Sequence, residues 1–484
     1  MIRQLAWAEL RHRPGRAALL VVGYALGVAV TIVLLAVGTA MLEQARDPRW
    51  VGGGDVLVLP EGTNPEMLRT GGVEALFLRV PQARFLVRDV LEGPRGRAFG
   101  VLAASPVVDG RPVELEVRGR RWTALATAEI PSRAAAVGAA PALIAGRWRD
   151  TPADRRVVAP TPAERLREMD RLHRPPPAVG GDSTWAEWHY ANVVLGRDRW
   201  LYVTFLIGGR VGTPGRWGGR LLLTVREPDG RVRRWAHTVP DRAVRFDTTG
   251  PDLIFERLGA FRLEDSGYRL DVRLPSARLD LRLEPTPGLA FPPTDLSGDE
   301  LVSGYVVPML HGRASGTVCL PRCQAVVHAP AYHDHNWGIW RDVAWDWGAA
   351  SDGDLALLYG AVRGPAATDR PLFAYLVDRA GPRGVFRASG VQVLAWRSHP
   401  APPGRVPARL AFTDSARGWT VTIDVQAAHI TNLGRARAPY FVQMRGVATV
   451  ARPIGPPRRL PGFFELYLDG DGRPSHRPLS NSER

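Results

Sequence analysis

The longest uninterrupted apolar stretch lies near the start of the chain. No residue from Ala17 to Leu42 is charged. As a helix, this stretch would be roughly 39 Å long, more than the ~30 Å hydrocarbon core of a bilayer. It continues through Met41 and Leu42, so it is longer than the apolar region of a signal peptide, which has about 7–15 residues. The pattern therefore predicts one uncleaved transmembrane helix over residues 17–42.

Basic residues flank this stretch unevenly. Four arginines precede it within residues 1–16, whereas the ten residues after it hold two arginines beside Glu43 and Asp47. Because arginine favours the cytoplasmic side, we expect residues 1–16 to be a cytoplasmic tail. No second stretch of comparable length appears, so we expect a single-pass cell-membrane protein whose remaining domains are extracytoplasmic.

Downstream of the apolar stretch, the pattern changes to short alternating segments. Residues 43–150 read as short strands with one or two helical stretches, and residues 113–117 (VELEV) alternate as a half-buried strand does. Residues 151–181 combine a charged helix with proline and glycine breaks, which predicts a linker. Residues 269–274 and 278–283 then alternate almost perfectly around a short turn, which is typical of antiparallel sheet with one buried face.

The predicted fold class is therefore mainly β, with a small α+β domain over residues 43–150. Closed barrels remove exposed strand edges, so we divide the remaining strands into barrel-like halves over residues 182–325 and 326–475, with a tail at 476–484. Strand periodicity alone does not distinguish barrels from sandwiches. A length of 484 residues also fits two or three domains.

Composition argues against a nucleic-acid partner. The chain contains no lysine, so all 63 basic residues are arginine, and the net charge is +15. These arginines are scattered among glycine, proline and acidic residues, whereas nucleic-acid binders gather their charge into runs or faces with interleaved aromatics. We expect no nucleic acid among the partners.

The most unusual segment is residues 331–338, AYHDHNWG. In an extended strand, successive side chains alternate between faces, so His333, His335 and Trp337 would share one face and Tyr332 and Asp334 the other. So many polar groups beside a large aromatic suit a pocket wall. The alternative is a buried hydrogen-bond network that fixes one barrel to the other.

The same segment also resembles part of a metal site. The pattern His333-x-His335 on a strand can chelate zinc with a third ligand from another strand, and His311 and His328 lie nearby in sequence. No H-E-x-x-H or second H-x-H accompanies it, so we expect no metal and no other cofactor.

Two further short patterns have structural interpretations. Cys319 and Cys323 flank Leu-Pro-Arg, and outside the cytoplasm a disulfide across that turn is favoured over two free thiols. Asp352 and Asp354 fit a hairpin turn better than an acid pair.

The N-terminal region resembles the start of an FtsX-like ABC-transporter permease of the lipoprotein-release or peptide-export kind. The resemblance is carried by residues 5–16 (LAWAELRHRPGR), the apolar stretch and residues 51–60 (VGGGDVLVLP). The family's three later helices and any G-x-x-x-x-G-K-[ST] loop are missing here. The resemblance thus implies anchoring and docking to ABC-transporter subunits rather than transport by this chain.

Residues 182–475 resemble the carotenoid 1,2-hydratase (hydroxyneurosporene synthase) family and its lipocalin-like relatives. The matching segments are Glu187-Trp188-His189-Tyr190, Ser303-Gly304-Tyr305 and, most specifically, YHDHNWG. The resemblance implies two tandem lipocalin-like barrels that hold a long isoprenoid or lipid. In the hydratases it also implies addition of water across a terminal double bond.

The resemblance also implies roles for particular residues. Hydration needs an acid for the alkene, an aromatic face for the cation and a base for the water. We expect Asp334 to be the acid, because a carboxyl in an apolar cavity stays protonated. His335 would orient or deprotonate the water and His333 would hydrogen-bond Asp334. The expected substrate contacts are Trp337, Tyr359, Tyr332 and Trp188.

One departure from the hydratase pattern keeps a second function open. Gly360 and Ala361 follow Tyr359, where the hydratases carry an acidic residue. The alternative is a non-catalytic lipid-binding accessory subunit of an ABC exporter.

Overall fold

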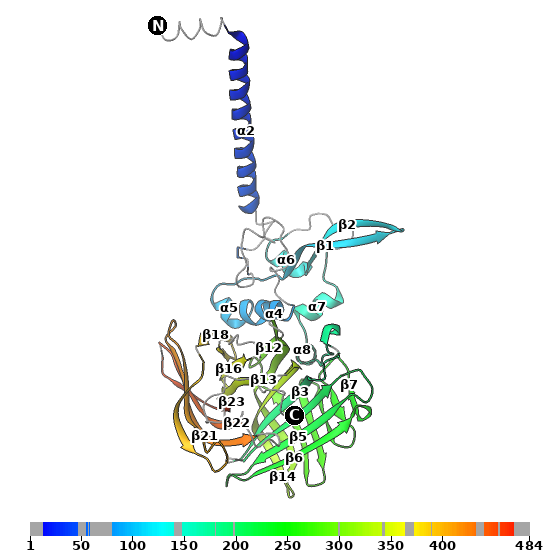
Figure 1. Ribbon diagram of the computed structural model, residues 1–484, viewed down its shortest axis with the longest axis vertical. Coiled ribbons are helices and arrows are strands. Elements are labelled where there is room, and N and C mark those ends of the chain that lie inside the picture. Colours follow the sequence, from blue (N-terminus) through cyan, green and yellow to red (C-terminus); the bar gives the residue numbers. More distant parts are fainter. Residues whose placement is uncertain are drawn as a thin grey trace. The chain divides into compact units, whose positions relative to one another are not determined.

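The computed structural model describes residues 13–46, 55–56, 58, 80–139, 148–179, 181–196, 199–298, 301–340, 344–363, 372–388, 390–431, 440–453 and 455–468. Two compact units divide the chain, one of residues 1–78 with 103–151 and one of residues 79–102 with 152–484. The expected fold class is confirmed. One N-terminal apolar helix and a small α+β region precede two large, barrel-like antiparallel sheets (Figure 1).

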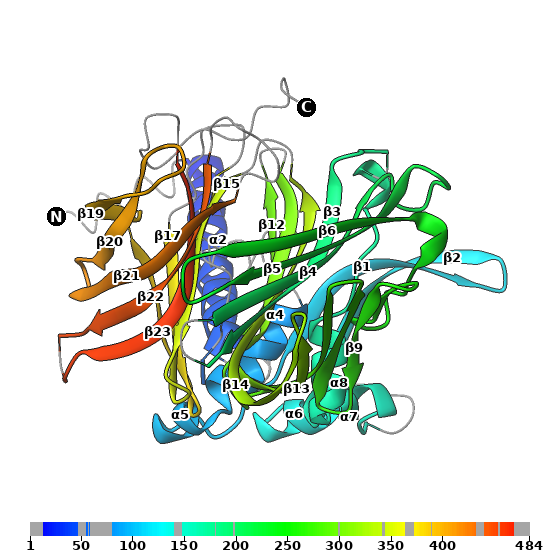
Figure 2. The same ribbon diagram turned by 90° about the horizontal axis from the view of Figure 1, so that it is seen from below.

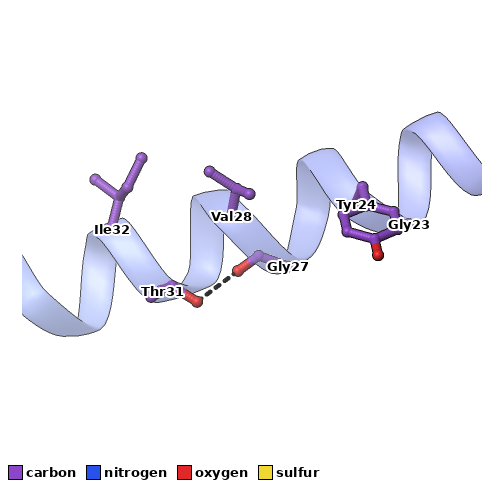
Figure 3. Close-up of a pocket in the computed structure, with 6 residues that line it drawn as sticks. All are labelled: Gly23, Tyr24, Gly27, Val28, Thr31 and Ile32. Atoms are coloured by element: carbon purple, nitrogen blue, oxygen red, sulfur yellow. Dashed lines mark hydrogen bonds between the residues drawn. The ribbon is translucent and has the colours of Figure 1, made fainter.

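The apolar stretch forms helix α2 (Pro14–Arg46), which is longer at both ends than the predicted span. By length and composition this exposed helix could cross a membrane, and a signal sequence would meet the same criteria. Gly23 and Gly27 leave a shallow hollow on one face (Figure 3). There the Thr31 hydroxyl donates to the Gly27 carbonyl oxygen at 2.8 Å, so this polar side chain is satisfied within its own helix.

The rest of the first unit contains a hairpin and a short helix. Strands β1 (Val107–Val117) and β2 (Arg120–Glu129) pair antiparallel, and α6 (Pro131–Ala136) follows. Leu115 lies opposite Trp122, with 48% and 57% of their surfaces exposed. The predicted strand at residues 113–117 is therefore formed, but its apolar face is not buried.

Part of the expected 43–150 domain belongs to the second unit instead. Helices α4 (Val80–Phe85), η2 (Leu86–Leu91) and α5 (Pro94–Ala98) lie in this part. The Arg95 guanidinium donates to both carboxylate oxygens of Asp378, at 2.9 and 2.8 Å, and ties α5 to the second sheet.

The expected linker forms helices α7 (Pro152–Val158) and α8 (Pro162–Met169) and a turn, η3 (Pro177–Val179). Thr161 begins α8 with a capping box, because its hydroxyl accepts from the Glu164 amide and the Glu164 carboxylate accepts from the Thr161 amide. After α8, the Leu172 amide donates to the Gly250 carbonyl oxygen at 3.0 Å, and Leu172 joins the core of the first sheet. The segment therefore docks on this sheet.

The first sheet runs from Trp185 to Ile339. Its order is β6-β5-β4-β3-β14-β13-β11-β10-β9-β8-β7, with β12 paired to β13. Strands β3, β4, β5 and β6 can be followed side by side in Figure 2. The β10–β11 hairpin carries the alternating segments noted above. The strands are β3 (Trp185–Leu195), β4 (Arg199–Gly209), β5 (Trp217–Arg226), β6 (Val232–Pro240), β7 (Val244–Phe246), β8 (Leu253–Phe255), β9 (Gly259–Glu264), β10 (Gly267–Leu274), β11 (Ala277–Pro285), β12 (Phe291–Gly298), β13 (Leu301–Cys319) and β14 (Cys323–Ile339), with η4 (Asp241–Ala243) between β6 and β7.

The second sheet has the order β18-β17-β16-β15-β23-β22-β21-β20-β19, again with antiparallel neighbours. Its strands are β15 (Ala344–Ser351), β16 (Leu355–Arg363), β17 (Leu372–Asp378), β18 (Gly381–Ala388), β19 (Gln392–Ser398), β20 (Arg405–Asp414), β21 (Trp419–Thr431), β22 (Tyr440–Ala451) and β23 (Arg458–Leu468). The β15–β16 turn is shaped by the Asp352 carboxylate, which accepts from the amides of Asp354 and Leu355.

The boundary between the sheets falls after Ile339 rather than near residue 325. Strand β14, which we expected to open the second barrel, pairs with β13 on one side and β3 on the other. The structure joins Cys319 and Cys323 in a disulfide across the β13–β14 turn. Because this tight hairpin pairs β14 with β13 over much of its length, β14 cannot leave the first sheet.

Each sheet covers an apolar core, and a third layer lies between the two sheets. We call this third layer the interlayer. It is rich in aromatic side chains from both sheets, which pack against one another over short ring distances. Its members include Tyr190, Trp200, Tyr202, Tyr305 and Tyr332 from the first sheet and Trp347, Tyr375 and Phe463 from the second.

Candidate functional site

Strand β14 separates two groups of buried polar side chains, as the alternation of its residues predicts. His333 and His335 point into the first sheet, where they meet Asp170. Tyr332 and Asp334 point into the interlayer, where they bond to each other. The expected division of faces is therefore correct, and it creates two sites rather than one.

We call the group inside the first sheet the inner cluster. Strand β3 contributes through its pairing with β14, which sets His189 opposite His335 and Glu187 opposite Trp337. The segment after α8 contributes an aspartate and a histidine. The cluster comprises Asp170, His173, Glu187, His189, His333 and His335.

Hydrogen bonds connect the inner cluster as a chain. Asp170 accepts from His333 Nε2 at 3.0 Å and from His335 Nδ1 at 2.9 Å, using a different oxygen for each. His335 Nε2 donates to Glu187 Oε1 at 2.9 Å. Glu187 also accepts from the backbone amide of His173 at 2.8 Å. His335 thus lies between two carboxylates, so its ring orientation is fixed from both sides.

The electrostatics of the inner cluster follow from this pairing. Burial by itself would raise the pKa of Asp170, but the charges of His333 and His189 and two hydrogen bonds outweigh it and hold this pKa well below its usual range. Burial would lower the pKa of His335, yet its hydrogen bonds to Asp170 and Glu187 raise that pKa to about 9. An imidazolium between carboxylates is the stable form of His335.

His189 is the one ring of the inner cluster without an ordinary hydrogen bond. It is almost completely buried, and neither ring nitrogen has a well-formed bond. The nearest carboxylate oxygen is Asp170 Oδ1, at 3.9 Å from His189 Nδ1, and the Pro251 backbone also lies close. Burial holds the pKa of His189 well below its ordinary value. The fully buried Tyr268 hydroxyl faces the same aspartate, also without a hydrogen bond of ordinary geometry.

The second group, the interlayer site, surrounds Asp334. Its carboxyl accepts from the Tyr332 hydroxyl and from the Asn336 amide, both at 2.7 Å. The Trp347 indole of the second sheet donates to the Tyr332 hydroxyl at 3.1 Å. Burial, reinforced by the negative charge of Glu465, raises the pKa of Asp334 to about 7 despite the two hydrogen bonds. The carboxyl is thus easily protonated within an aromatic layer.

Glu465 on β23 is the second carboxyl of the interlayer site. It accepts from the Gln443 amide at 3.0 Å and from the Trp345 indole at 3.2 Å. Burial raises its pKa, and its charge also raises the pKa of the buried Tyr190 hydroxyl. Tyr190 makes no ordinary hydrogen bond through that hydroxyl. Each sheet therefore supplies one carboxyl, and the Tyr190 hydroxyl lies near both.

The structure separates several residues that we expected to act together. The predicted hydrogen bond between His333 and Asp334 is wrong, because the two side chains point to opposite faces of β14 and His333 bonds instead to Asp170 and to the Tyr190 carbonyl oxygen. The catalytic roles expected for His333, His335 and Asp334 stay predictions. These three groups cannot all reach one reacting atom from opposite faces.

The expected substrate contacts also lie apart. Trp337 stacks on His173 with ring centroids 4.0 Å apart, next to the inner cluster. Tyr332 and Trp188 face the interlayer, and Trp188 packs against Trp340. Tyr359 lies in the core of the second sheet. Of these four aromatics, Tyr332 is the one that bonds to Asp334, which accepts from its hydroxyl at 2.7 Å.

Sequence reasoning missed Asp170, Glu187 and His189 as site residues, and also Glu465. Asp170 ends a charged helix that looks solvent-exposed, so its burial has no local signal. The other three residues do have a local sequence signal. Glu187 and His189 alternate on β3 as His333 and His335 do on β14. Glu465 is the one charged residue within Phe463–Leu468.

Comparisons with known proteins give distant similarities to solved structures. An AttH-type protein of Nitrosomonas europaea is 17% identical, with 61% of this chain and 96% of that chain covered and a TM-score of 0.45. Kievitone hydratase of Nectria haematococca is 10% identical, with 63% of this chain and 95% of that chain covered and a TM-score of 0.42. CghA with Sch210972 is 14% identical, with 60% of this chain and 90% of that chain covered and a TM-score of 0.44.

At such identities and TM-scores, these similarities carry no argument about what this chain binds or does. No protein-family model and no curated protein matches the sequence. The carotenoid-hydratase and permease resemblances therefore stay predictions.

Proposed function

We propose that the two sheets form a lipocalin-like hydro-lyase that adds water to a double bond of a hydrophobic isoprenoid or lipid at the interlayer site. The observation that carries the proposal is the position of Asp334. Its carboxyl is buried between the sheets, held by the Tyr332 hydroxyl and surrounded by aromatic rings.

The chemistry assigns a role to each carboxyl. The Asp334 carboxyl gives its proton to one carbon of the alkene, and the other carbon becomes a tertiary cation that aromatic faces such as Trp347 stabilise. Water attacks the cation, and Glu465 accepts the proton that the water loses. The net reaction is alkene plus water to tertiary alcohol, and a proton returning from Glu465 through solvent to Asp334 restores the starting state.

The buried setting supports this division of labour. A carboxyl among aromatic rings favours its neutral form, and exclusion of bulk water limits premature capture of the cation. Two carboxyls from different sheets also give one acid and one base, the two roles that acid–base catalysis of hydration needs. We further propose that α2 anchors the protein in the cell membrane with the sheets outside, where a membrane-dissolved substrate is available.

The test is mass spectrometry of lipids that co-purify with the full chain in detergent. Wild type should carry an isoprenoid or lipid with one added water. Asp334→Asn should carry the same ligand without it, because an amide cannot supply the proton. As a matched control, Asp414→Asn removes another buried carboxylate, which pairs with Arg417 at the surface, and should leave the hydrated product unchanged.

Two results would count against the proposal. Equal amounts of hydrated product in wild type and Asp334→Asn would remove Asp334 from the chemistry. If only unmodified lipid co-purifies with wild type, the hydration proposal is refuted. That result would favour the accessory-subunit alternative, in which the protein binds lipid for an ABC exporter.

A further inference from the structure

The inner cluster lies on the opposite face of β14 from the interlayer site and takes no part in the proposed hydration. It gathers two carboxylates and several imidazoles inside an otherwise apolar core. Buried polar groups are normally all hydrogen-bonded, because an unpaired one costs about 1–3 kcal/mol. The His189 ring, whose nitrogens make no hydrogen bond of ordinary geometry although the Pro251 backbone lies close, therefore needs an explanation.

We propose that Asp170, His189 and His335 bind a divalent transition-metal ion, with zinc as the first candidate. One ligand atom from each of these side chains lies within 4.8 Å of the other two. The proposal is independent of the hydration chemistry, since it concerns other residues on another face of the strand.

The separations between the ligand atoms fit such an ion. Asp170 Oδ1 lies 2.9 Å from His335 Nδ1 and 3.9 Å from His189 Nδ1. Metal–ligand bonds of about 2.1 Å in a tetrahedron place neighbouring ligand atoms about 3.4 Å apart. The two measured distances bracket this value, so shifts of about half an ångström would complete the site.

The surrounding residues hydrogen-bond to the proposed ligands, as metal-binding histidines usually need. His335 Nε2 donates to Glu187 at 2.9 Å, so Nδ1, which donates to Asp170 Oδ1 in the metal-free chain, is the nitrogen that would release its proton and bind the metal. His333 Nε2 bonds to Asp170 Oδ2, the oxygen that the proposed ion does not use. A carboxylate behind a ligating histidine fixes its tautomer and orientation, and loss of such a partner typically weakens metal binding 10–100-fold.

The chemistry of the ligand atoms indicates which ion would bind, and the elements that carry them indicate its structural role. Two imidazoles and one carboxylate favour zinc and related transition ions over calcium or magnesium, which prefer oxygen ligands. The three ligands come from β3, from β14 and from the segment after α8. A bound ion would therefore pin this segment to the first sheet. The fourth position is left for water, near the buried Tyr268 hydroxyl that faces Asp170.

The experiment uses the full chain in detergent, purified without a polyhistidine tag and stripped with a chelator. Titration with Zn²⁺ alone, followed by elemental analysis, should give one equivalent per chain. Co²⁺ should give the visible absorption of a four-coordinate nitrogen–oxygen site. His189→Gln, which keeps most of the side-chain volume, should weaken Zn²⁺ binding at least tenfold, and Glu187→Gln should weaken it 10–100-fold.

His311→Gln is the matched control, because His311 is a half-buried histidine that bonds to Thr286 outside the cluster. It should bind Zn²⁺ as wild type does. Zn²⁺ should also raise the melting temperature of wild type but not of His189→Gln, which separates lost binding from lost folding. Failure of wild type to bind Zn²⁺ or Co²⁺ would overturn the proposal, as would equal binding by wild type and His189→Gln.

A failed hydration test with intact zinc binding would refute only the proposed function. Hydration by a chain that binds no metal would refute only the metal site.

Discussion

We predict that His429 makes the contact between the two sheets sensitive to acid. It lies on β21 of the second sheet, is 5% exposed, and its Nε2 bonds to the hydroxyl of Tyr202 on β4 of the first sheet. The two rings also stack, 5.7 Å apart. Burial, with a further contribution from the charge of Arg234, lowers the pKa of His429 from 6.5 to about 3.

The size and sign of the effect follow from these two pKa values. Folding favours the neutral ring, so the contribution of His429 to stability is complete above the unfolded pKa of 6.5 and is lost as the pH falls toward 3. At pH 7.5 the loss is negligible. At pH 5 the unfolded chain is almost fully protonated at this ring while the folded chain is not, which costs about 2 kcal/mol of unfolding free energy.

The assay compares guanidinium unfolding of wild type and His429→Gln in detergent at pH 7.5 and pH 5. Glutamine still bonds to Tyr202 but does not titrate, so the variant should lose about 2 kcal/mol less than wild type on acidification. The control is His237→Gln on β6, whose ring is not buried and which should follow wild type. Equal acid losses in wild type and His429→Gln would refute the reasoning.

Three further variants test the architecture through the unfolding free energy. Tyr332→Phe removes a donor to Asp334 and should cost about 1–3 kcal/mol; no loss would mean that their bond is not formed. Thr161→Ala removes the α8 cap and should cost about 0.5–2 kcal/mol, whereas an unchanged midpoint would argue against a docked helix. Gly348→Ala would place its Cβ against the buried Tyr359 ring, closer than van der Waals contact allows, and should lower the unfolding free energy by about 1–3 kcal/mol. An unchanged unfolding free energy would argue against the packing of Tyr359 on this glycine.

Local pattern was enough to predict much of the fold. Three features can be read from the residues of a single helix, hairpin or strand, and each is present in the structure. They are the uncharged stretch of α2, the alternation of the β10–β11 hairpin and the division of faces on β14. The sheet boundary was misplaced because strand pairing is a non-local property. Nothing within Cys323–Ile339 says whether its partner is β3 or a later strand.

The site was harder to predict for the same reason. Asp170 lies 163 residues from His333, and Glu465 belongs to the other sheet from Asp334, so neither pairing leaves a mark in local sequence. Because the HDH segment is so dense in polar groups, all three catalytic roles were assigned to it. In the structure its alternation divides those groups between two sites, and each site is completed by carboxylates from distant segments.

The central claim is that Asp334 protonates an alkene within the interlayer. The most direct measurement incubates the delipidated full chain with lycopene, an acyclic isoprenoid with terminal trisubstituted double bonds, in water labelled with oxygen-18. Wild type should yield a product that carries one labelled oxygen, and Asp334→Asn should yield none while still binding lycopene. Product without the label, or labelled product from both proteins in equal amount, would contradict the account.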